Sequence, residues 1–251
     1  MSFKKTNNNL PLLIFGKHPV TAALNNPRRK CKILHTTKAM WEELQTAYPE
    51  LKINVQLREA RDLNMMLPMG SNHQNIILEV APLKELSIED ILESTSNKQT
   101  SCLVILDQVT DPHNVGAIIR SGAAFGIDAV ILPENNSPKE NNTIIKTSAG
   151  ACEVVPMVHV TNIAQCIKQL KQEGYWVIGL DGNTNIELSS KILSEKIVFI
   201  MGSEDVGMRK LTKDNCDYIA KISISSNAES LNVSNAAAIA MYEFSKLKQI
   251  N

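Results

Sequence analysis

Residues 111–120, DPHNVGAIIR, place Asn114 and Arg120 on an expected helix that needs neither side chain for packing. Asp111 and Pro112 predict a helix start, because Asp caps the first backbone N–H groups and proline fits the first turn. An apolar stripe follows at helical spacing, and Asn114 and Arg120 fall about 100° and about 130° from its centre. An amide that donates and accepts hydrogen bonds, and a guanidinium fork that matches phosphate, are therefore expected at the helix surface. Taken alone, this segment is more typical of a solvated Arg and a helix-cap Asn than of a functional site. Two later segments reverse this preference.

Two segments near the C-terminus place small and polar residues directly after strands. The apolar run 197–200 is followed by MGSEDVGM at 201–208. The run 222–224 is followed by SLNVS at 230–234, which leads into an alanine-rich helix. Loops after the carboxyl ends of strands are where α/β sheets bind ligands. Together with residues 111–120, these segments predict one ligand site.

A Rossmann-type nucleotide-binding domain would carry a glycine-rich loop after its first strand. Here the expected strand 103–106 is followed by DQVT at 107–110, which contains no glycine. A bound cofactor is therefore expected elsewhere, in the loops after Met201 and Ile222 and in the turn 230–232. Such loops offer backbone N–H and C=O groups, which can pair with an adenine without any charged side chain.

In order and spacing, these three segments resemble the signature motifs of the SpoU-type ribose methyltransferases of the SPOUT superfamily. FGKHPV at 15–20 and His73-Gln74 also resemble that family's substrate-binding domain, so the likeness runs from about residue 12 to 244. It is closest to the bacterial enzymes that methylate a guanosine 2′-oxygen of 23S rRNA. The resemblance implies S-adenosylmethionine as the methyl donor, and loss of the sulfonium charge on transfer means that no metal is expected.

The resemblance also implies roles for individual residues. Backbone contacts to the cofactor fall on Gly202, Ile222 and Leu231. Without the resemblance, Gly202 fits a plain turn glycine, and Ile222 and Leu231 fit buried core residues. The polar site positions implied to be catalytic are Arg120, Asn114, Glu204, Ser230 and Asn232.

Each of these polar residues has an expected task. Arg120 is expected to clamp a phosphate beside the target ribose and to stabilise the developing alkoxide; a guanidinium has no free lone pair to accept a proton, so a role as general base is not expected. Asn114 and Asn232 are expected to orient Arg120, the ribose or the cofactor, and Ser230 to bond the 2′-oxygen or a phosphate. Glu204 fits the first turn of a helix, where carboxylates are favoured; its second interpretation is to fix the loop or Arg120.

Three positions depart from the family's pattern. Ser223 stands where the family has a proline, Ser226 where it has a glycine, and Asn75 where a glycine is frequent, although Asn tolerates left-handed φ. Losing the proline frees φ and adds an N–H donor, so a looser cofactor loop is expected. Ser223 and Ser226 keep open the alternative of a non-catalytic RNA-binding ribosome-assembly factor. A tRNA or other rRNA ribose methyltransferase of the same family also stays open, since the N-terminal domain makes this alternative less favoured but does not exclude it.

The elements that position these residues form an α/β protein. In the first part of the chain, strand and helix alternate, so a mixed or parallel sheet covered by helices is expected. The resemblance implies a small ribosomal protein L30e-like fold for this part. Strands are expected at 12–15, 32–36, 52–57 and 75–80, and helices at 18–24, 38–48 and 58–66.

The second part begins with the continuous apolar run 102–106, typical of a buried parallel strand. The resemblance implies a deep C-terminal trefoil knot, against the general rule that chains are unknotted. Alanines at 236–238 and 240 would allow a crossing loop or a partner helix to approach closely. Further strands are expected at 129–132, 153–155, 175–180, 197–201 and 218–222, and helices at 84–92, 113–125, 141–148, 163–173 and from 233.

These patterns predict two domains and a linker. We expect an RNA substrate-binding domain at 1–82, a linker at 83–101 and a SPOUT methyltransferase domain at 102–251. The linker is placed there because residues 93–101 contain no apolar side chain.

Charge is unevenly distributed although the net charge is zero. Residues 1–80 carry eleven Lys and Arg against six Asp and Glu. The densest cluster is Arg28, Arg29 and Lys30, with Lys32 close by; alone, it fits a solvated turn equally well. Beside the resemblance to RNA-modifying enzymes, it predicts phosphate contacts with 23S rRNA or a ribosomal assembly particle.

Bulk composition limits the remaining possibilities. With 251 residues and 43% hydrophobic content, the chain can bury real cores. No run of ~18 apolar residues and no signal-peptide core are present, so a cytoplasmic protein without a membrane span is expected. Five scattered cysteines without a C-x-x-C pair fit free thiols better than a zinc site. The resemblance further implies a homodimer.

Overall fold

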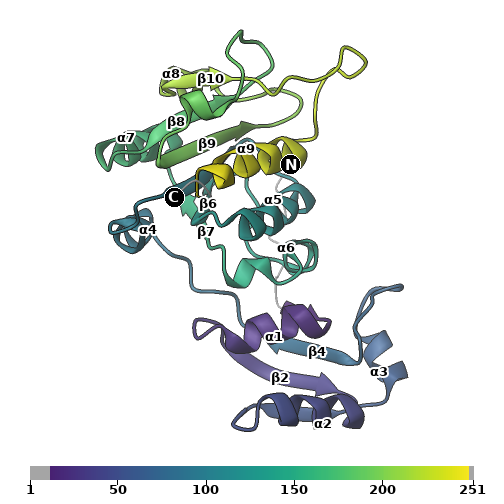
Figure 1. Ribbon diagram of the computed structural model, residues 1–251. Coiled ribbons are helices and arrows are strands. Elements are labelled where there is room, and N and C mark those ends of the chain that lie inside the picture. Colours follow the sequence, from purple (N-terminus) through teal and green to yellow (C-terminus); the bar gives the residue numbers. More distant parts are fainter. Residues whose placement is uncertain (1–11, 249–251) are drawn as a thin grey trace, which may run out of the picture. The chain divides into compact units, whose positions relative to one another are not determined.

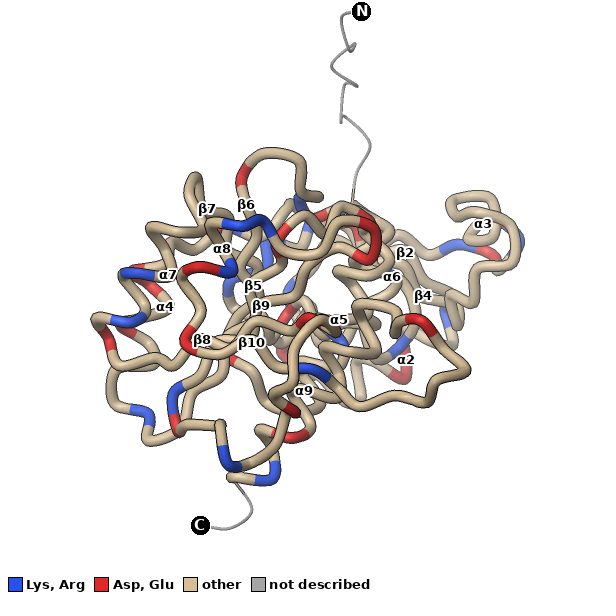
Figure 2. Tube along the Cα trace, turned by 90° about the horizontal axis from the view of Figure 1, so that it is seen from above, with Lys and Arg blue, Asp and Glu red and all other residues tan. Residues whose placement is uncertain are grey.

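The computed structural model describes residues 12–248, so the outer ends of both expected domains, 1–11 and 249–251, lie outside the described residues. The chain divides into two compact units, Met1–Leu83 and Lys84–Asn251, each of which has an α/β fold (Figure 1). Along the trace, basic and acidic positions are interspersed (Figure 2). Between residues 12 and 248, no helix is both long and apolar enough to cross a membrane.

The first unit is built on a four-stranded mixed sheet, as the alternating pattern predicts. Its strand order is β1-β4-β2-β3; β4 is antiparallel to β1 and β2, whereas β2 and β3 are parallel. Ile14, Leu34 and Leu63 are fully buried and come from two strands and a helix. The elements are β1 (Leu12–Phe15), α1 (Lys17–Asn25), β2 (Cys31–Thr36), α2 (Lys38–Ala47), β3 (Asn54–Leu57), α3 (Ala60–Met65) and β4 (Ile76–Val80).

The second unit is built on a six-stranded sheet in the order β10-β8-β9-β5-β6-β7, with every pair parallel. The central strand β5 (Ser101–Asp107) is buried along its whole length, which explains its unbroken apolar sequence. The other strands are β6 (Ala129–Pro133), β7 (Met157–Val160), β8 (Trp176–Leu180), β9 (Lys196–Gly202) and β10 (Tyr218–Ala220). The helices are α4 (Ile88–Thr95), α5 (Pro112–Phe125), α6 (Asn142–Ser148), α7 (Ile163–Gln172), α8 (Lys210–Asp214) and α9 (Val233–Lys248).

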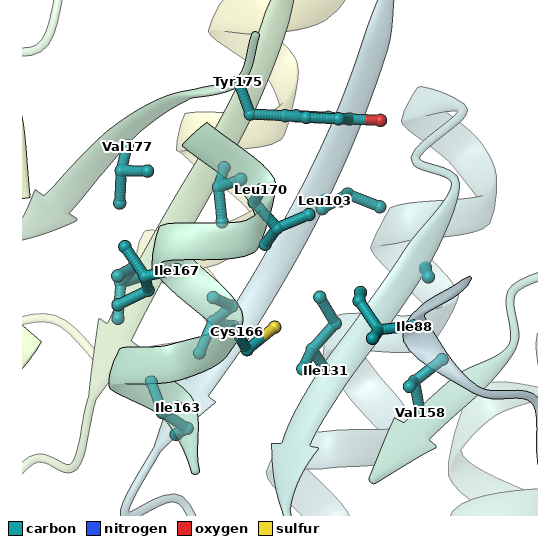
Figure 3. Packing of buried hydrophobic residues seen from close by; sticks show 14 of the residues in the cluster. Ile88, Leu103, Ile131, Val158, Ile163, Cys166, Ile167, Leu170, Tyr175 and Val177 are labelled. Carbon is teal, nitrogen blue, oxygen red and sulfur yellow. The ribbon is translucent and has the colours of Figure 1, made fainter. Parts of the chain in front are cut away.

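One face of this sheet is covered by α7 and α4. Ile163, Ile167 and Leu170 on α7 pack with strand residues such as Leu103 and Ile131, as Figure 3 shows. Cys166 lies in the same cluster, and burial raises the pKa of its thiol to about 12. This thiol stays protonated at neutral pH and is no nucleophile.

The opposite face carries α5 and α9, which pack against each other. The apolar stripe of α5 is buried as its spacing predicts, with Val115, Ile118 and Ile119 fully covered. Gly122 lies so close to Ile127 that an added Cβ would approach its side chain to 2.5 Å. The rings of Phe125 on α5 and Tyr242 on α9 lie 5.7 Å apart.

The strand expected at 153–155 is wrong. Those residues fall in and after a short 3-10 helix, Ala151–Glu153, and the strand β7 begins only at Met157. Gly150, with φ of 91°, redirects the chain after α6, and Pro156 precedes the strand and accepts a hydrogen bond from Val130 N. The strand at this place in the chain is therefore Met157–Val160, after Pro156, and not 153–155.

The segment 83–101, expected to be a linker, is largely part of the second unit. Helix α4 starts with a capping box made by Ser87 and Asp90. Thr95 is buried and accepts a hydrogen bond from Tyr175 Oη at 2.9 Å, and Tyr175 also bonds Ser101 at 2.7 Å. Two polar side chains of this segment, Thr95 and Ser101, are thus buried and hydrogen-bonded inside the fold, which a search for apolar residues alone misses.

Candidate active site

A cavity of about 480 Å³ opens at the carboxyl ends of β8, β9 and β10. This is the edge where parallel α/β sheets bind ligands. The cavity is large enough for a small-molecule cofactor. Its lining comes from residues 180–183, 201–207, 213, 222, 224, 229–231, 233 and 236.

The three residues expected to contact a cofactor all line this cavity. Gly202 ends β9, Ile222 follows β10, and Leu231 lies just before α9. All three are partly exposed, which distinguishes Ile222 and Leu231 from buried core residues. Residues separated by up to 29 positions are thus brought to one cavity.

Gly202 is required by the close approach of its own loop. A Cβ on Gly202 would lie 2.3 Å from the carbonyl carbon of Gly207 and 2.4 Å from Met208 N. Gly207 N donates to Ser203 O at 2.9 Å, which closes residues 203–207 into a tight turn. No helix begins at Glu204: the next helix in this described stretch, α8, starts at Lys210.

Asn232 joins two of the expected catalytic residues from distant parts of the chain. Its Nδ2 donates to Asn114 Oδ1 at 3.1 Å and to Glu204 Oε1 at 2.7 Å. Glu204 Oε1 also accepts from Val233 N at 3.0 Å, and Asn232 Oδ1 accepts from Ser234 N at 2.9 Å. Glu204 therefore fixes the loop, which is the second of its two interpretations.

Ser230 and Arg120 are not joined to this network. Ser230 lines the cavity and is exposed. Arg120 is exposed on α5 and does not line the cavity, and its side chain has no hydrogen-bond or ion-pair partner within residues 12–248. Helix α5 is nevertheless fixed at its start as predicted, because Asp111 Oδ1 accepts from His113 N at 2.9 Å.

A buried carboxylate that the sequence pattern did not reveal anchors the 202–209 loop. Asp107, the last residue of β5, is fully buried and accepts from Arg209 N at 2.9 Å and from Arg209 Nε at 2.7 Å. The next residue, Gln108, donates from Nε2 to Gly207 O at 3.1 Å. In place of a glycine-rich loop, the end of β5 thus carries two side chains, Asp107 and Gln108, that hold the cavity loop.

A second charged pair, Asp181 and Lys213, lies in the cavity wall and was also missed. Burial alone would raise the pKa of Asp181, but hydrogen bonds from Lys213 and from Asn183 N outweigh it and hold this pKa below its usual value. Asp181 follows β8 directly, as Leu-Asp-Gly-Asn at 180–183. A polar turn at the carboxyl end of a parallel strand was the available signal.

The basic cluster of the first unit is not uniform. Arg28, Lys30 and Lys32 are exposed, and Lys32 Nζ lies 3.5 Å from Glu79 Oε1. Arg29 is only 5% exposed and donates from Nη1 to Ala81 O at 2.9 Å. Its guanidinium satisfies a backbone carbonyl beyond the end of β4, so it differs from the surface contact that the sequence predicted.

The motif positions of the first unit pack on one another. Lys17 N donates to Gln74 Oε1 at 2.8 Å, and the φ of Gly16 is 88°. His73 Nδ1 accepts from Asn75 N at 3.0 Å. Asn75, which stands where the family often has glycine, adopts a left-handed conformation with φ of 62°. Asn tolerates this conformation better than most residues with a side chain.

Solved structures with a similar fold cover most of the chain. The SpoU methyltransferase AviRb from Streptomyces viridochromogenes, solved in complex with the cofactor AdoMet, covers 94% of this chain and 90% of its own, with a TM-score of 0.77 and 20% identity. An AdoMet-bound rRNA methyltransferase from Sinorhizobium meliloti covers 94% of this chain and 87% of its own, with a TM-score of 0.74 and 21% identity. At these identities the likeness establishes the fold alone.

Sequence comparison is more specific. Residues 101–242 match the SpoU rRNA methylase family, and residues 13–86 match the RNA 2′-O ribose methyltransferase substrate-binding family. The chain therefore belongs to the SpoU rRNA methylase family. It is 34% identical to the 23S rRNA (guanosine-2′-O-)-methyltransferase RlmB of Pseudomonas putida over 94% of this chain and 97% of that protein. It is 35% identical to RlmB of Photobacterium profundum over 95% and 98% of the two chains.

Proposed function

We propose that the protein is an S-adenosylmethionine-dependent RNA methyltransferase that methylates the ribose 2′-oxygen of a guanosine in 23S rRNA. The bonds from Asn232 to Asn114 and Glu204 carry this proposal, because they join the three motif segments beside one cavity. The activity named for relatives that match nearly the whole chain supports it.

The cavity suits S-adenosylmethionine in size and in the kind of groups it offers. Backbone groups of Gly202, Ile222 and Leu231 would hold the cofactor, and the bare Cα of Gly202 leaves its loop tightly closed. Asp181 and Lys213 add one paired charge of each sign to the wall. When bound, the cofactor supplies an electrophilic methyl group on a sulfonium, which needs no metal to be transferred.

The polar residues near the cavity would act on the RNA. Arg120 offers a planar fork of donors, so it binds a phosphate beside the target ribose and stabilises the developing alkoxide. Asn114 and Asn232 position the reacting groups, and Ser230 offers a hydroxyl for the 2′-oxygen or a phosphate.

We assign the two units different tasks on the same RNA. The first unit, an L30e-like domain in this proposal, grips the substrate, and exposed Arg28, Lys30 and Lys32 supply phosphate contacts. The second unit is the SPOUT methyltransferase domain, and its last segment forms a trefoil knot. The contact of Glu204 with Asn232 and Val233 supports that last assignment, since it brings the C-terminal segment against the 202–207 loop.

We further infer a homodimer whose partner subunit lines each site. The family resemblance supports this inference. So does the position of Arg120, whose guanidinium is exposed and lies outside the cavity lining of a single chain.

In vitro methylation of RNA from a strain that lacks this gene tests the proposal. We expect the purified chain to transfer a radiolabelled methyl group to one guanosine 2′-oxygen of 23S rRNA. Transfer to tRNA or 16S rRNA instead would reassign the substrate within the family. RNA binding without transfer, and without S-adenosylmethionine binding by calorimetry, would identify a non-catalytic assembly factor.

A further inference from the structure

Residues 181–188, which follow β8 and which we call the β8 extension, run beside β10 and the chain after it. Asp181 N donates to Ala220 O at 3.0 Å. Thr184 Oγ1 donates to Ile219 O at 3.0 Å. The β8 extension therefore continues the pairing of β8 with β10 beyond the end of the regular sheet.

Two further backbone bonds carry this pairing to the cavity. Lys221 N donates to Ile186 O at 2.8 Å, and Leu188 N donates to Lys221 O at 2.8 Å. Lys221 and Glu187 thereby form an isolated parallel bridge. Lys221 directly precedes Ile222, which lines the cavity.

The residue after Ile222 is held by the same extension. Ser223 Oγ donates to Glu187 Oε1 at 2.6 Å. Ile222 is thus flanked by two residues that are both bonded to the β8 extension, one through backbone and one through side chains. From Ser223 to Ser230 the chain is exposed throughout, so the Ser223–Glu187 bond is the last of these tethers.

We propose that Glu187 is a positioning residue that, through Ser223, sets the backbone of Ile222 for cofactor binding; this rests on the proposed function. A proline at this position would fix φ through its ring, whereas the φ of Ser223 is free. The conformation of Ser223 must therefore be set by its contacts. A carboxylate that accepts from a hydroxyl makes a strong hydrogen bond, which meets this need. Glu187 itself does not line the cavity and acts only through its neighbour.

Calorimetric titration of the full chain with S-adenosylmethionine, without RNA, tests this proposal. We expect Ser223→Ala and Glu187→Ala each to raise Kd about five- to tenfold, the range for one lost hydrogen bond. The double variant should bind no more weakly than either single variant, because both remove the same contact. Glu187→Gln and Ser223→Thr keep an acceptor and a hydroxyl, so they should bind within about twofold of the original chain.

Two controls separate positioning from general damage. Asn227→Ala truncates another exposed side chain on the same segment, outside the cavity lining, and should leave Kd unchanged. Thermal unfolding of the two alanine variants without cofactor should match the original chain, because both side chains are exposed. In steady-state assays, KM for the cofactor should rise while kcat is kept.

The outcomes distinguish this inference from the proposed function. If both alanine variants bind within about twofold of the original chain, the inference is overturned and the proposed function stands. If the original chain itself binds no S-adenosylmethionine, the proposed function fails and the inference fails with it.

Discussion

Asn114, Glu204 and Asn232 come from segments far apart in the chain and hold one another by hydrogen bonds. The same Asn232 caps α9 through Ser234 N, so one side chain both starts a helix and joins two loops. Such a set positions groups more than it stabilises the fold, because its members lie at or near the surface. Substitutions here should therefore separate activity from stability.

Asn114→Ala should lower kcat at least about a hundredfold, because misplacement of reacting groups by about 1 Å can cost this much. The fold should be kept, since alanine favours a helix and the residue makes its described side-chain bond only with Asn232. Methyl transfer and thermal unfolding, measured together, check this prediction. His113→Ala, an exposed neighbour on the same turn, is the matched control, and a fully active Asn114→Ala would remove Asn114 from the site.

Arg120→Lys should lower kcat by about two orders of magnitude while leaving the unfolding midpoint unchanged. Lysine keeps the charge but lacks the planar fork that grips a phosphate with two donors. Arg120 is exposed and has no described partner whose loss would destabilise the helix. Single-turnover methylation measures the effect; full turnover by this variant would contradict the role assigned to Arg120.

Residue types and spacing predicted which segments meet, but not every side chain between them. The motif positions that the sequence singled out include Gly202, Ile222 and Leu231, which share one cavity. Asp107 and Asp181 were missed, although the polar turn at 180–183 was a signal for Asp181. A single carboxylate at the end of a strand does not reveal its role. Its value comes from Arg209 and Lys213, which only the folded chain brings beside it.

Strands and helices were largely predictable wherever the apolar pattern extended over the whole element. Strand β5 and helix α5 lie within one or two residues of their expected bounds. The strand at 153–155 failed because Pro156 and the glycine-driven turn at Gly150 shift the start of β7. The linker failed because Thr95 and Ser101 are buried as hydrogen-bonded polar residues, which no measure of hydropathy detects.

The end of β9 leaves no room for a side chain at Gly202. Gly202→Ala would place a Cβ 2.3 Å from the backbone of Gly207, so the 203–207 turn must shift. We expect a loss of at least about 1–3 kcal/mol in the free energy of unfolding, together with weaker cofactor binding. Gly182→Ala is the control for stability, since its Cβ would meet nothing within 4 Å. Urea unfolding measures both variants, and equal stability would contradict this account of the turn.

The Asp181–Lys213 pair should make stability depend on acidity. Because the pKa of Asp181 is lowered in the folded chain, its contribution is present above the unfolded pKa of about 3.9 and is lost as pH falls below it. Asp181→Asn should therefore destabilise the protein at pH 6–7, and the difference from the original chain should shrink towards pH 3. Urea unfolding across this range checks the prediction, with exposed Asp205→Asn as control. A difference that stays constant with pH would contradict it.

Taken as a whole, the chain combines two α/β units with opposite tendencies in charge, since its basic excess lies in residues 1–80. The net charge of zero therefore does not reveal the basic excess of the first unit. This uneven distribution suits the proposed division into an RNA-binding unit and a catalytic unit. Knotting and dimerisation are beyond pattern reasoning, because neither leaves a period or a motif in the sequence. Both are proposed from the family resemblance, with support from the contacts of Glu204 for the knot and from the exposed position of Arg120 for the dimer.

We expect the protein to be a homodimer in solution, with twice the mass of one 27.7 kDa chain. Light scattering coupled to size-exclusion chromatography measures this directly at micromolar concentration. An active monomer would remove the inference that a partner subunit lines each site.

The most direct test of the central claim is a crystal structure of the protein soaked with S-adenosylmethionine. The account predicts density for a bent cofactor in the cavity at the ends of β8, β9 and β10, bonded to the backbone of Gly202, Ile222 and Leu231. Density for the cofactor at any other place, or an extended cofactor away from these three residues, would contradict it.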